Sequence, residues 1–471
     1  MRLNSALLPH QVEAVNKLIK LKVGALFMEQ GTGKTITTLE IIRRRYEARK
    51  VECAIWLCPC SAKENIKNEI ITQCPRELAK IFIICGIETL SSSVRANDYL
   101  LTLANEKKVF LVIDESLLVK NPSAYRTINI ARISSKCPYR IILNGTPISR
   151  NEADLFSQFK LLDWRILGYR SYWSFAANHL EYDDYGRVRR VLNKDYLAKK
   201  ISPYTYQVLK SDCLKLPDKN YRKYGFWLTD TQNEEYNRAA NYLMDDLDEW
   251  KPETIYRLFS GLQAIISGKK LIFKSRNHFQ SVEMFKNPLD NPRISALIDI
   301  LPEDSKEKVI IYCRYESEVS QLCNIIPNSV RFDGKVSIKK RNSALESFRK
   351  DKQYLIANKN CAGFSLNLQF CHKIIYFSND WDLGKRLQSE DRIHRIGQKF
   401  DVEIIDIFAY NTLDEKILDC LSRKEMILDN IKKEIDNAEN IKDGIKRIIY
   451  GRRYRHEVFD CSDLVERSKD A

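Results

Sequence analysis

Residues 22–35 read KVGALFMEQGTGKT, and this stretch decides the fold of the first part of the chain. An apolar run over residues 22–28 leads into two glycines, and residues 36–49 then have a helical pattern. A strand followed by a glycine-rich turn and a helix is the context of a phosphate-binding loop, because glycines let backbone N–H groups turn toward phosphate oxygens. Met28 stands where the G-x-x-x-x-G-K-[ST] pattern has its first glycine, so a chance Gly-Lys-Thr in a loop is the alternative.

This loop supplies most of the candidate nucleotide-binding residues. Lys34 is expected to reach the β- and γ-phosphates of ATP, and the hydroxyl of Thr35 is expected to bind Mg²⁺. The remaining loop residues expected to contact the nucleotide are Glu29, Gln30, Gly31, Thr32 and Gly33. The sequence therefore predicts ATP and Mg²⁺ as the ligands of this segment.

Short apolar runs recur along the chain with helical patterns between them, as in strands buried on both faces of a parallel sheet. The runs of the first part are Lys22–Met28, Val51–Cys58, Lys80–Ile84, Val109–Ile113 and Arg140–Leu143. Those of the second part are Lys308–Tyr312, Val330–Phe332, Tyr354–Ala357, Lys373–Phe377 and Val402–Phe408. This alternation predicts an α/β protein with two doubly wound parallel-sheet domains.

The composition of the chain suggests four segments. Residues 1–165 and 291–435 are expected to form the two α/β domains, and 166–290, rich in aromatic residues, to form helical insertions and a linker. Within the linker, the change from acidic to basic residues around Gly186 predicts a hairpin. Residues 436–471 are expected to form a basic C-terminal tail, which either adds affinity for DNA or is simply solvated.

A second apolar run ends in adjacent carboxylates, Asp114 and Glu115. At the carboxyl end of a strand, Asp114 is expected to hold Mg²⁺, and Glu115 to orient and polarise the attacking water. Two such carboxylates are often only a surface turn. Together with a phosphate-binding loop, they predict an ATPase.

A third candidate element, residues 388–398, reads QSEDRIHRIGQ. Its arginines, Arg392 and Arg395, are three positions apart, so a helix would place them on one face. Arginines held in this way neutralise the charge that develops on a γ-phosphate during hydrolysis. The alternative is a solvated basic face of a helix.

The amino-acid composition excludes several classes of protein. The 471 residues include 77 Lys and Arg against 62 Asp and Glu, a net charge of +15, and 44% are hydrophobic, which excludes wholesale disorder. No apolar run approaches the ~20 residues of a membrane helix, so a soluble protein of the cell interior is expected. The 13 cysteines include no C-x-x-C pair and predict reduced thiols rather than a zinc site. The basic excess suggests a polyanionic partner.

These motifs together resemble those of superfamily 2 helicases, and in particular of the Swi/Snf-like branch of ATP-dependent DNA translocases. The run RIHRIGQ at residues 392–398 carries most of the resemblance. Residues 8–11, LPHQ, resemble the glutamine motif that recognises adenine, and residues 143–147, LNGTP, resemble motif III. Further matches in the order of the family extend the similarity over roughly residues 3–425.

The resemblance implies two RecA-like domains with ATP in the cleft between them, and Arg392 and Arg395 on its γ-phosphate. It adds Gln11, Gly363 and Gln388 to the candidate nucleotide contacts. It also implies duplex or branched DNA as the partner, bound through phosphates without sequence specificity, and movement that remodels or branch-migrates DNA structures. A monomer without a membrane partner, in the cytoplasm of a bacterial or phage-infected cell, is expected.

The sequence departs from the family pattern at positions that help to couple hydrolysis to movement. Leu117 replaces the usual His of the D-E-x-H box, and Asn144 replaces the usual Thr of motif III. In motif V, Ala362 and Ser365 stand at expected glycines. Because the residues for ATP chemistry are retained, we expect hydrolysis to persist with altered coupling.

Three other readings of the sequence remain open. The chain could be a helicase that separates strands, an ATPase stimulated by RNA, or a DNA-binding scaffold without turnover. The Arg-Ile-Gly-Gln ending favours the DNA branch over RNA, and the retained Lys34, Asp114 and Glu115 argue against a scaffold.

Overall fold

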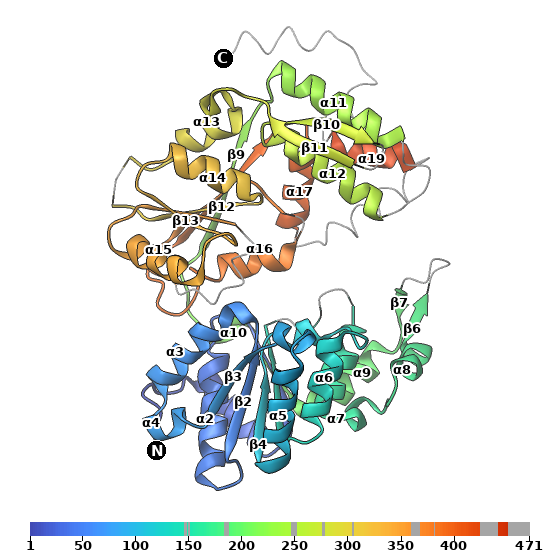
Figure 1. Cartoon of the computed structure of the whole chain (residues 1–471), viewed down its shortest axis with the longest axis vertical. Helices are drawn as coiled ribbons and strands as arrows, with labels where there is room; N and C mark the ends of the chain where they lie inside the picture. The colour runs from blue at the N-terminus through green and yellow to red at the C-terminus, as the bar shows by residue number, and fades with distance from the viewer. Residues whose placement is uncertain are drawn as a thin grey trace. The chain divides into compact units, whose positions relative to one another are not determined.

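The structure is a computed structural model that describes residues 1–145, 148, 151–182, 188–245, 252–275, 278–303, 306–358, 368–380, 382–423 and 441–450. The described chain divides into two compact units, which meet in sequence at Leu216 and Pro217 (Figure 1). Unit 1 begins at Met1 and unit 2 continues from Pro217. Each unit is built around its own parallel sheet.

The sheet of unit 1 has the strand order β3-β2-β4-β5-β1-β8. These strands are β1 (Val23–Met28), β2 (Cys53–Cys58), β3 (Phe82–Gly86), β4 (Val109–Ile113), β5 (Tyr139–Asn144) and β8 (Thr205–Val208). Every pairing in this sheet is parallel. The carboxyl ends of its strands therefore lie along one edge, where ligands of such sheets bind.

Helices cover both faces of this sheet because alternate residues of each buried strand point to opposite sides. In β1, Ala25 and Phe27 belong to one apolar cluster, while Leu26 and Met28 belong to another. The helices that complete the cluster of Leu26 are α1 (Pro9–Leu18), α2 (Lys34–Glu47), α3 (Lys63–Gln73) and α4 (Arg76–Ala79). Those on the side of Phe27 are α5 (Val94–Glu106), α6 (Tyr125–Ser134), α7 (Asp154–Leu167), α8 (Tyr172–His179) and α9 (Lys194–Ile201).

The sheet of unit 2 has the order β13-β14-β12-β15-β16-β9, again with parallel pairings. Its strands are β9 (Lys219–Phe226), β12 (Val309–Cys313), β13 (Ser329–Phe332), β14 (Tyr354–Asn358), β15 (Lys373–Tyr376) and β16 (Val402–Ala409). Helix α10 (Lys210–Cys213) is the last described helix of unit 1. The described helices of unit 2 are α11 (Asp230–Asp245), α12 (Pro252–Ile266), α13 (Pro292–Asp299), α14 (Glu316–Ile325), α15 (Ile338–Lys350), α16 (Leu383–Glu390), α17 (Leu413–Ser422) and α19 (Ile441–Ile449). An antiparallel pair, β10 (Lys269–Ser275) and β11 (His278–Glu283), packs against α12.

This architecture confirms the predicted fold class of two parallel-sheet α/β domains. The stretch 166–290, expected to be a separate segment, is divided between the units. The reason is that strand β8, which precedes the boundary between the units, pairs with β1 in the sheet of unit 1. Strand β9, which follows the boundary, pairs with β16 in the sheet of unit 2. Strand β8 is short and partly polar, and its sequence does not distinguish it from the surrounding loops.

The hairpin expected around Gly186 is present in its described part, where β6 (Leu180–Tyr182) pairs antiparallel with β7 (Val188–Val191). Gly186 itself lies outside the described residues.

The described part of the C-terminal segment is packed against unit 2 and is not a solvated tail. Helix α19 buries Ile445, Ile448 and Ile449 in the core of unit 2, while Arg447 is exposed. The basic residues after Tyr450 lie outside the described residues. None of the described helices combines the length and the apolar character that crossing a membrane requires.

Candidate functional site

The loop between β1 and α2 has a backbone that only glycines adopt readily. Gly31 has φ +82° and Gly33, which caps α2, has φ +94°. A Cβ on Gly33 would lie 2.2 Å from Nε2 of Gln11, so space as well as conformation requires glycine there. The ammonium of Lys34 donates a hydrogen bond to the carbonyl of Met28 at 2.9 Å, which holds it over the loop. A glycine-rich turn of this kind before a helix is typical of loops that bind phosphate groups.

Two side chains of helix α1 form hydrogen bonds to the loop. The Nε2 group of Gln11 donates to the carbonyl of Thr32 at 2.9 Å, and Nε2 of His10 lies 2.8 Å from the same oxygen. The Oε1 atom of Gln11 accepts the N–H of Leu8 at 3.0 Å. The Nε2 end of the Gln11 amide thus orders the loop, and its Oε1 end caps the start of α1. Sequence reasoning missed His10, although it directly precedes Gln11 in the quoted motif.

Glu29 joins the loop to the segment around the end of β8, near the last residues of unit 1. Its carboxylate accepts the N–H of Lys210 at 2.8 Å, and its own N–H donates to the carbonyl of Val208 at 3.1 Å. The hydroxyl of Thr32 donates to the carbonyl of Glu29 at 2.7 Å. The Glu29 side chain is therefore held by backbone of the segment that leaves β8.

The carboxylates after β4 lie at the same edge of the sheet as the loop. The N–H of Asp114 donates to the carbonyl of Leu57 at 2.7 Å, and its Oδ1 accepts the N–H of Glu115 at 3.0 Å. Glu115 has φ +50°, a left-handed conformation that costs energy for a residue other than glycine and concentrates at functional sites. Nε2 of Gln30 lies 3.5 Å from Oε1 of Glu115, which brings the loop and this carboxylate together.

The electrostatics of Asp114 match a cation site. Burial raises the pKa of its carboxyl from 3.8 to about 7, the Glu115 carboxylate adds to the rise, and Lys34 acts in the opposite direction. A cation beside this carboxyl would favour its ionised form. Mg²⁺ prefers oxygen donors, and the hydroxyl of Thr35 and the carboxylate of Asp114 are such donors, so the residues fit the ion.

A buried polar bridge lies behind these carboxylates. The hydroxyl of Ser116 donates to Oε1 of Gln158 at 2.6 Å, and Nδ2 of Asn144 lies 3.5 Å from the same hydroxyl. All three side chains are buried. The bridge connects the segment after β4, the end of β5 and helix α7, and it includes Asn144, one of the two departures from the family pattern.

The arginines of the third element belong to unit 2, and the prediction that they share a face of a helix is wrong. Helix α16 ends at Glu390, and Arg392 and Arg395 lie in the turns that follow. The carbonyl of Arg392 accepts the N–H of Leu368 at 3.1 Å instead of continuing a helical ladder. Burial of Ile393 holds the chain in this path.

A charged network, which sequence reasoning did not identify, anchors α16 immediately before these arginines. Arg386 is buried and pairs with both oxygens of Asp406 and with Glu390, and its guanidinium lies 3.4 Å from the centroid of the Tyr376 ring. Burial alone would raise the pKa of Glu390, but the charges of Arg386 and Lys219 hold it below its usual range. The network fixes the end of α16 to β16 and β9.

Two residues inside the run 388–398 fix the turn itself. Nε2 of His394 lies 2.8 Å from the carbonyl oxygen of Pro217, and Nε2 of Gln398 donates to the carbonyl of Cys371 at 2.8 Å. Of the other candidates, Gln388 is half-buried on α16, and Gly363 lies outside the described residues. The structure thus brings together the loop candidates with Gln11, Asp114 and Glu115 in unit 1, and Gln388 with the arginine turn in unit 2.

Comparisons with known proteins point to one family. A family model described as an SNF2-related domain matches residues 82–278, and one described as a helicase conserved C-terminal domain matches residues 292–397. The TATA-binding protein-associated factor mot1 of Aspergillus fumigatus is 25% identical over 88% of this chain and 26% of its own length. An uncharacterized ATP-dependent helicase of Mycoplasma genitalium is 24% identical over 86% of this chain and 40% of its own.

The chain therefore spans between about a quarter and two fifths of the length of these curated relatives. Among solved structures, the SWI2/SNF2 ATPase core of Sulfolobus solfataricus in complex with dsDNA is 22% identical, with a TM-score of 0.42. That match covers 96% of this chain and 98% of the other.

Proposed function

Because the chain belongs to the Snf2-like branch of superfamily 2 helicases, we propose that it is a DNA-dependent ATPase that moves along duplex DNA. The observation that supports this most is the contact between Gln30 and Glu115, which gathers the phosphate-binding loop and the two carboxylates at one edge of unit 1. A nucleotide cradle and a group that can polarise water are the parts that ATP hydrolysis needs.

The proposed roles follow from the geometry. Lys34 binds the β- and γ-phosphates, and Glu115 orients the attacking water. Thr35 and Asp114 hold Mg²⁺, which neutralises phosphate charge when it is bound with ATP. Arg392 and Arg395 of unit 2 stabilise the charge that develops on the γ-phosphate.

The proposed partner is DNA held through its phosphates. The net charge of +15 favours a polyanion, and contacts to phosphates carry no sequence information. Affinity is then independent of sequence and falls steeply with salt. Movement along duplex DNA would remodel or branch-migrate DNA structures.

The test is steady-state ATP hydrolysis without nucleic acid and with duplex, single-stranded and forked DNA and RNA. We expect duplex DNA to stimulate the wild type, and Lys34→Ala to lower the stimulated rate at least about 100-fold. Lys50→Ala removes an exposed lysine just after the same helix and should leave the rate unchanged. Equal rates for the wild type and Lys34→Ala would overturn the proposal in favour of a scaffold without turnover.

A strand-separating helicase is the second candidate, supported by the β6–β7 hairpin. Arg189 and Arg190 are exposed on β7, as a hairpin that inserts between strands would require. Replacing residues 182–189 by a short Gly-Ser linker keeps the buried Leu180 and Val191 and should abolish unwinding of a forked duplex if this candidate is correct. Unwinding at the wild-type rate by that variant would exclude a role of the hairpin.

A further inference from the structure

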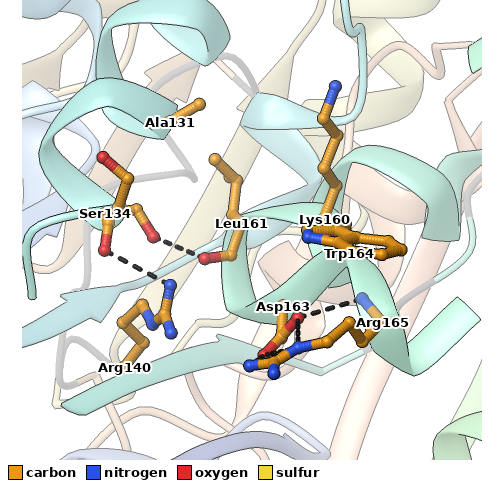
Figure 2. Close-up of a pocket in the computed structure, with 9 residues that line it drawn as sticks. Ala131, Ser134, Arg140, Lys160, Leu161, Asp163, Trp164 and Arg165 are labelled. Atoms are coloured by element: carbon orange, nitrogen blue, oxygen red, sulfur yellow. Dashed lines mark hydrogen bonds and ion pairs between the residues drawn. The ribbon is translucent and has the colours of Figure 1, made fainter. Parts of the chain in front are cut away.

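Unit 1 contains a groove that the proposed ATPase chemistry does not use. Helices α6 and α7 pack together and leave a cavity of about 330 Å³, in which Arg140 and Lys160 lie on opposite sides (Figure 2). A second cavity of about 430 Å³ shares Ala131, Ser135, Lys160 and Leu161 with the first, so the two form one groove. Arg140 is near the start of β5, whose opposite end carries Asn144, so this end of the groove lies away from the nucleotide edge.

Arg140 has an unmet capacity to bind an anion. Its one guanidinium hydrogen bond within the described residues goes from Nη1 to the carbonyl of Ser134 at 3.3 Å, and its buried Nε has no partner there. Burial lowers the pKa of Arg140, and the charge of Asp163 only partly compensates. Asp163 is itself bound by Arg165, with distances of 2.6 and 3.0 Å (Figure 2). A carboxylate entering the cavity would compensate the guanidinium charge that these contacts leave only partly balanced.

A break in helix α7 shapes this end of the groove. Asp163 has φ −166° and ψ 123°, so the helix is interrupted there and restarts at Trp164. Trp164 lines the cavity with 36% of its surface exposed, and the guanidinium of Arg170 lies 4.4 Å from the centroid of its ring. The break therefore presents an aromatic wall beside Arg140.

The other end of the groove is apolar. Ile128 lines it and is 40% exposed, and Leu161 and Ala131 form its floor. Tyr125, three residues before Ile128 and therefore on the same side of α6, is 76% exposed. Large apolar side chains exposed next to a cavity mark a docking surface for an apolar side chain.

The charges around the groove indicate which class of molecule it binds. Its lining has four basic side chains, Arg132, Arg140, Lys160 and Arg165, against one carboxylate, Asp163. A nucleic acid would use the cations but leave the apolar floor empty, because its backbone contacts are polar. A peptide that combines carboxylates with an apolar side chain would use both.

We propose that the groove between α6 and α7 docks an acidic segment of a partner protein, with a carboxylate on Arg140 and an apolar side chain beside Ile128 and Leu161. Docking there recruits the protein through a surface separate from the nucleotide site, so it does not depend on the proposed ATPase activity.

The test is fluorescence anisotropy on the full chain at 150 mM salt. The probe is a fluorescein-labelled peptide with Leu and Phe four positions apart among Asp and Glu residues. Two further peptides replace either the apolar residues by Ser or the acidic residues by Lys, and a labelled DNA duplex represents the other polyanion. Because the chain has six tryptophans, the part of the change in tryptophan fluorescence that is lost in Trp164→Phe reports whether the probe enters the groove.

The variant Arg132→Glu/Lys160→Glu reverses two exposed charges of the groove, and Lys107→Glu/Lys108→Glu makes the same change of net charge on exposed residues that line neither cavity. We expect the groove variant to raise the Kd of the acidic-apolar peptide at least about tenfold and the control variant to raise it less than about twofold. Replacement of Leu and Phe by Ser should also weaken binding about tenfold.

Equal effects of the two variants, or equal binding of the Ser peptide, would overturn the proposal because they indicate attraction to net charge alone. Loss of duplex DNA binding in the groove variant, with peptide binding unchanged, would also overturn it and assign the groove to nucleic acid.

Discussion

Nε2 of His394 lies 2.8 Å from the carbonyl oxygen of Pro217. His394 stands between Arg392 and Arg395, and Pro217 is the first residue of unit 2, where the chain arrives from unit 1. Because a carbonyl oxygen only accepts, the imidazole must carry hydrogen on Nε2. The hydrogen bond thus ties the arginine turn to the segment that joins the two units.

Loss of this hydrogen bond should misplace the arginines. We expect His394→Ala to lower kcat for DNA-stimulated hydrolysis by about 10- to 100-fold with little change in the KM for ATP, since small displacements of catalytic groups are costly. His394→Gln, whose amide also donates, should recover part of the rate. His372→Ala is the control, because this half-buried histidine of the same unit contacts Glu307 and Phe400. A changed KM with unchanged kcat would contradict the positioning role.

Asp114 should make the stability of the nucleotide-free protein depend on pH. Burial raises the pKa of this carboxyl to about 7, against about 3.9 in an unfolded chain, so its ionisation destabilises the fold as pH rises from 4 through 7. Asp114→Asn should therefore unfold about 5 °C above the wild type at pH 8 and at the same temperature near pH 4, while losing ATPase activity. Thermal unfolding at both pH values checks this. An equal difference at both would show that ionisation is not the cause.

Two glycines with the same backbone conformation separate steric effects from conformational strain. Gly33 has φ +94° and Gly168 has φ +89°, but a Cβ would meet Gln11 only at Gly33 and nothing within 4 Å at Gly168. We expect Gly33→Ala to raise the Kd of a fluorescent ATP analogue at least about tenfold, because Gln11 must leave the loop. Gly168→Ala should cost about 1–2 kcal/mol of stability without changing nucleotide affinity. Similar nucleotide affinities for both variants would contradict the inference that Gln11 orders the loop.

A buried hydroxyl holds the C-terminal helix. Tyr236 donates to the carbonyl of Ile449 at 2.7 Å and accepts the N–H of Leu413 at 3.0 Å. Tyr236→Phe leaves both groups unsatisfied and should lower the free energy of unfolding by about 1–3 kcal/mol. It should also speed proteolysis near α19. Tyr242→Phe, on the exposed side of α11, should do neither in denaturation and limited-proteolysis experiments.

The two departures from the family pattern should affect coupling more than hydrolysis. Asn144 contacts Ser116 in the buried bridge, and Leu117 is the next residue along the chain. Leu117→His/Asn144→Thr should therefore change the length of DNA travelled per ATP, measured by triplex displacement, while the ATPase rate changes less. Travel per ATP equal to that of the wild type would refute the idea.

The strands were largely predictable because most are apolar runs bounded by loop residues. The run 109–113 matches β4, and the others agree with their strands to within a few residues. Strands β8 and β9 were not predicted, since their pairing with β1 and β16 is decided by distant partners rather than by local pattern. The arginine run has helical spacing, but tertiary contacts of Arg392 and Ile393 end the helix before it.

In the candidate site, the local parts were predictable and the supporting contacts were not. The phosphate-binding loop lies within one short segment, so a single local pattern predicts all of its residues. The bond between Ser116 and Gln158 joins residues 42 positions apart, and that between Lys219 and Glu390 joins residues 171 apart. No pattern within a short window contains such pairs.

The position of β9 has a consequence for how the chain folds as it is made. The strands of the first sheet are complete by residue 208, so unit 1 can form while the rest is still being synthesised. Strand β9 must wait for β16, about 180 residues later, which at roughly 5–20 residues per second is about 10–40 s. Lys219, Arg222 and Lys223 give the waiting strand a charge that discourages pairing with other chains. The same cations later meet Glu390, Glu403 and Asp419, so the residues that protect the nascent strand also secure its final partner.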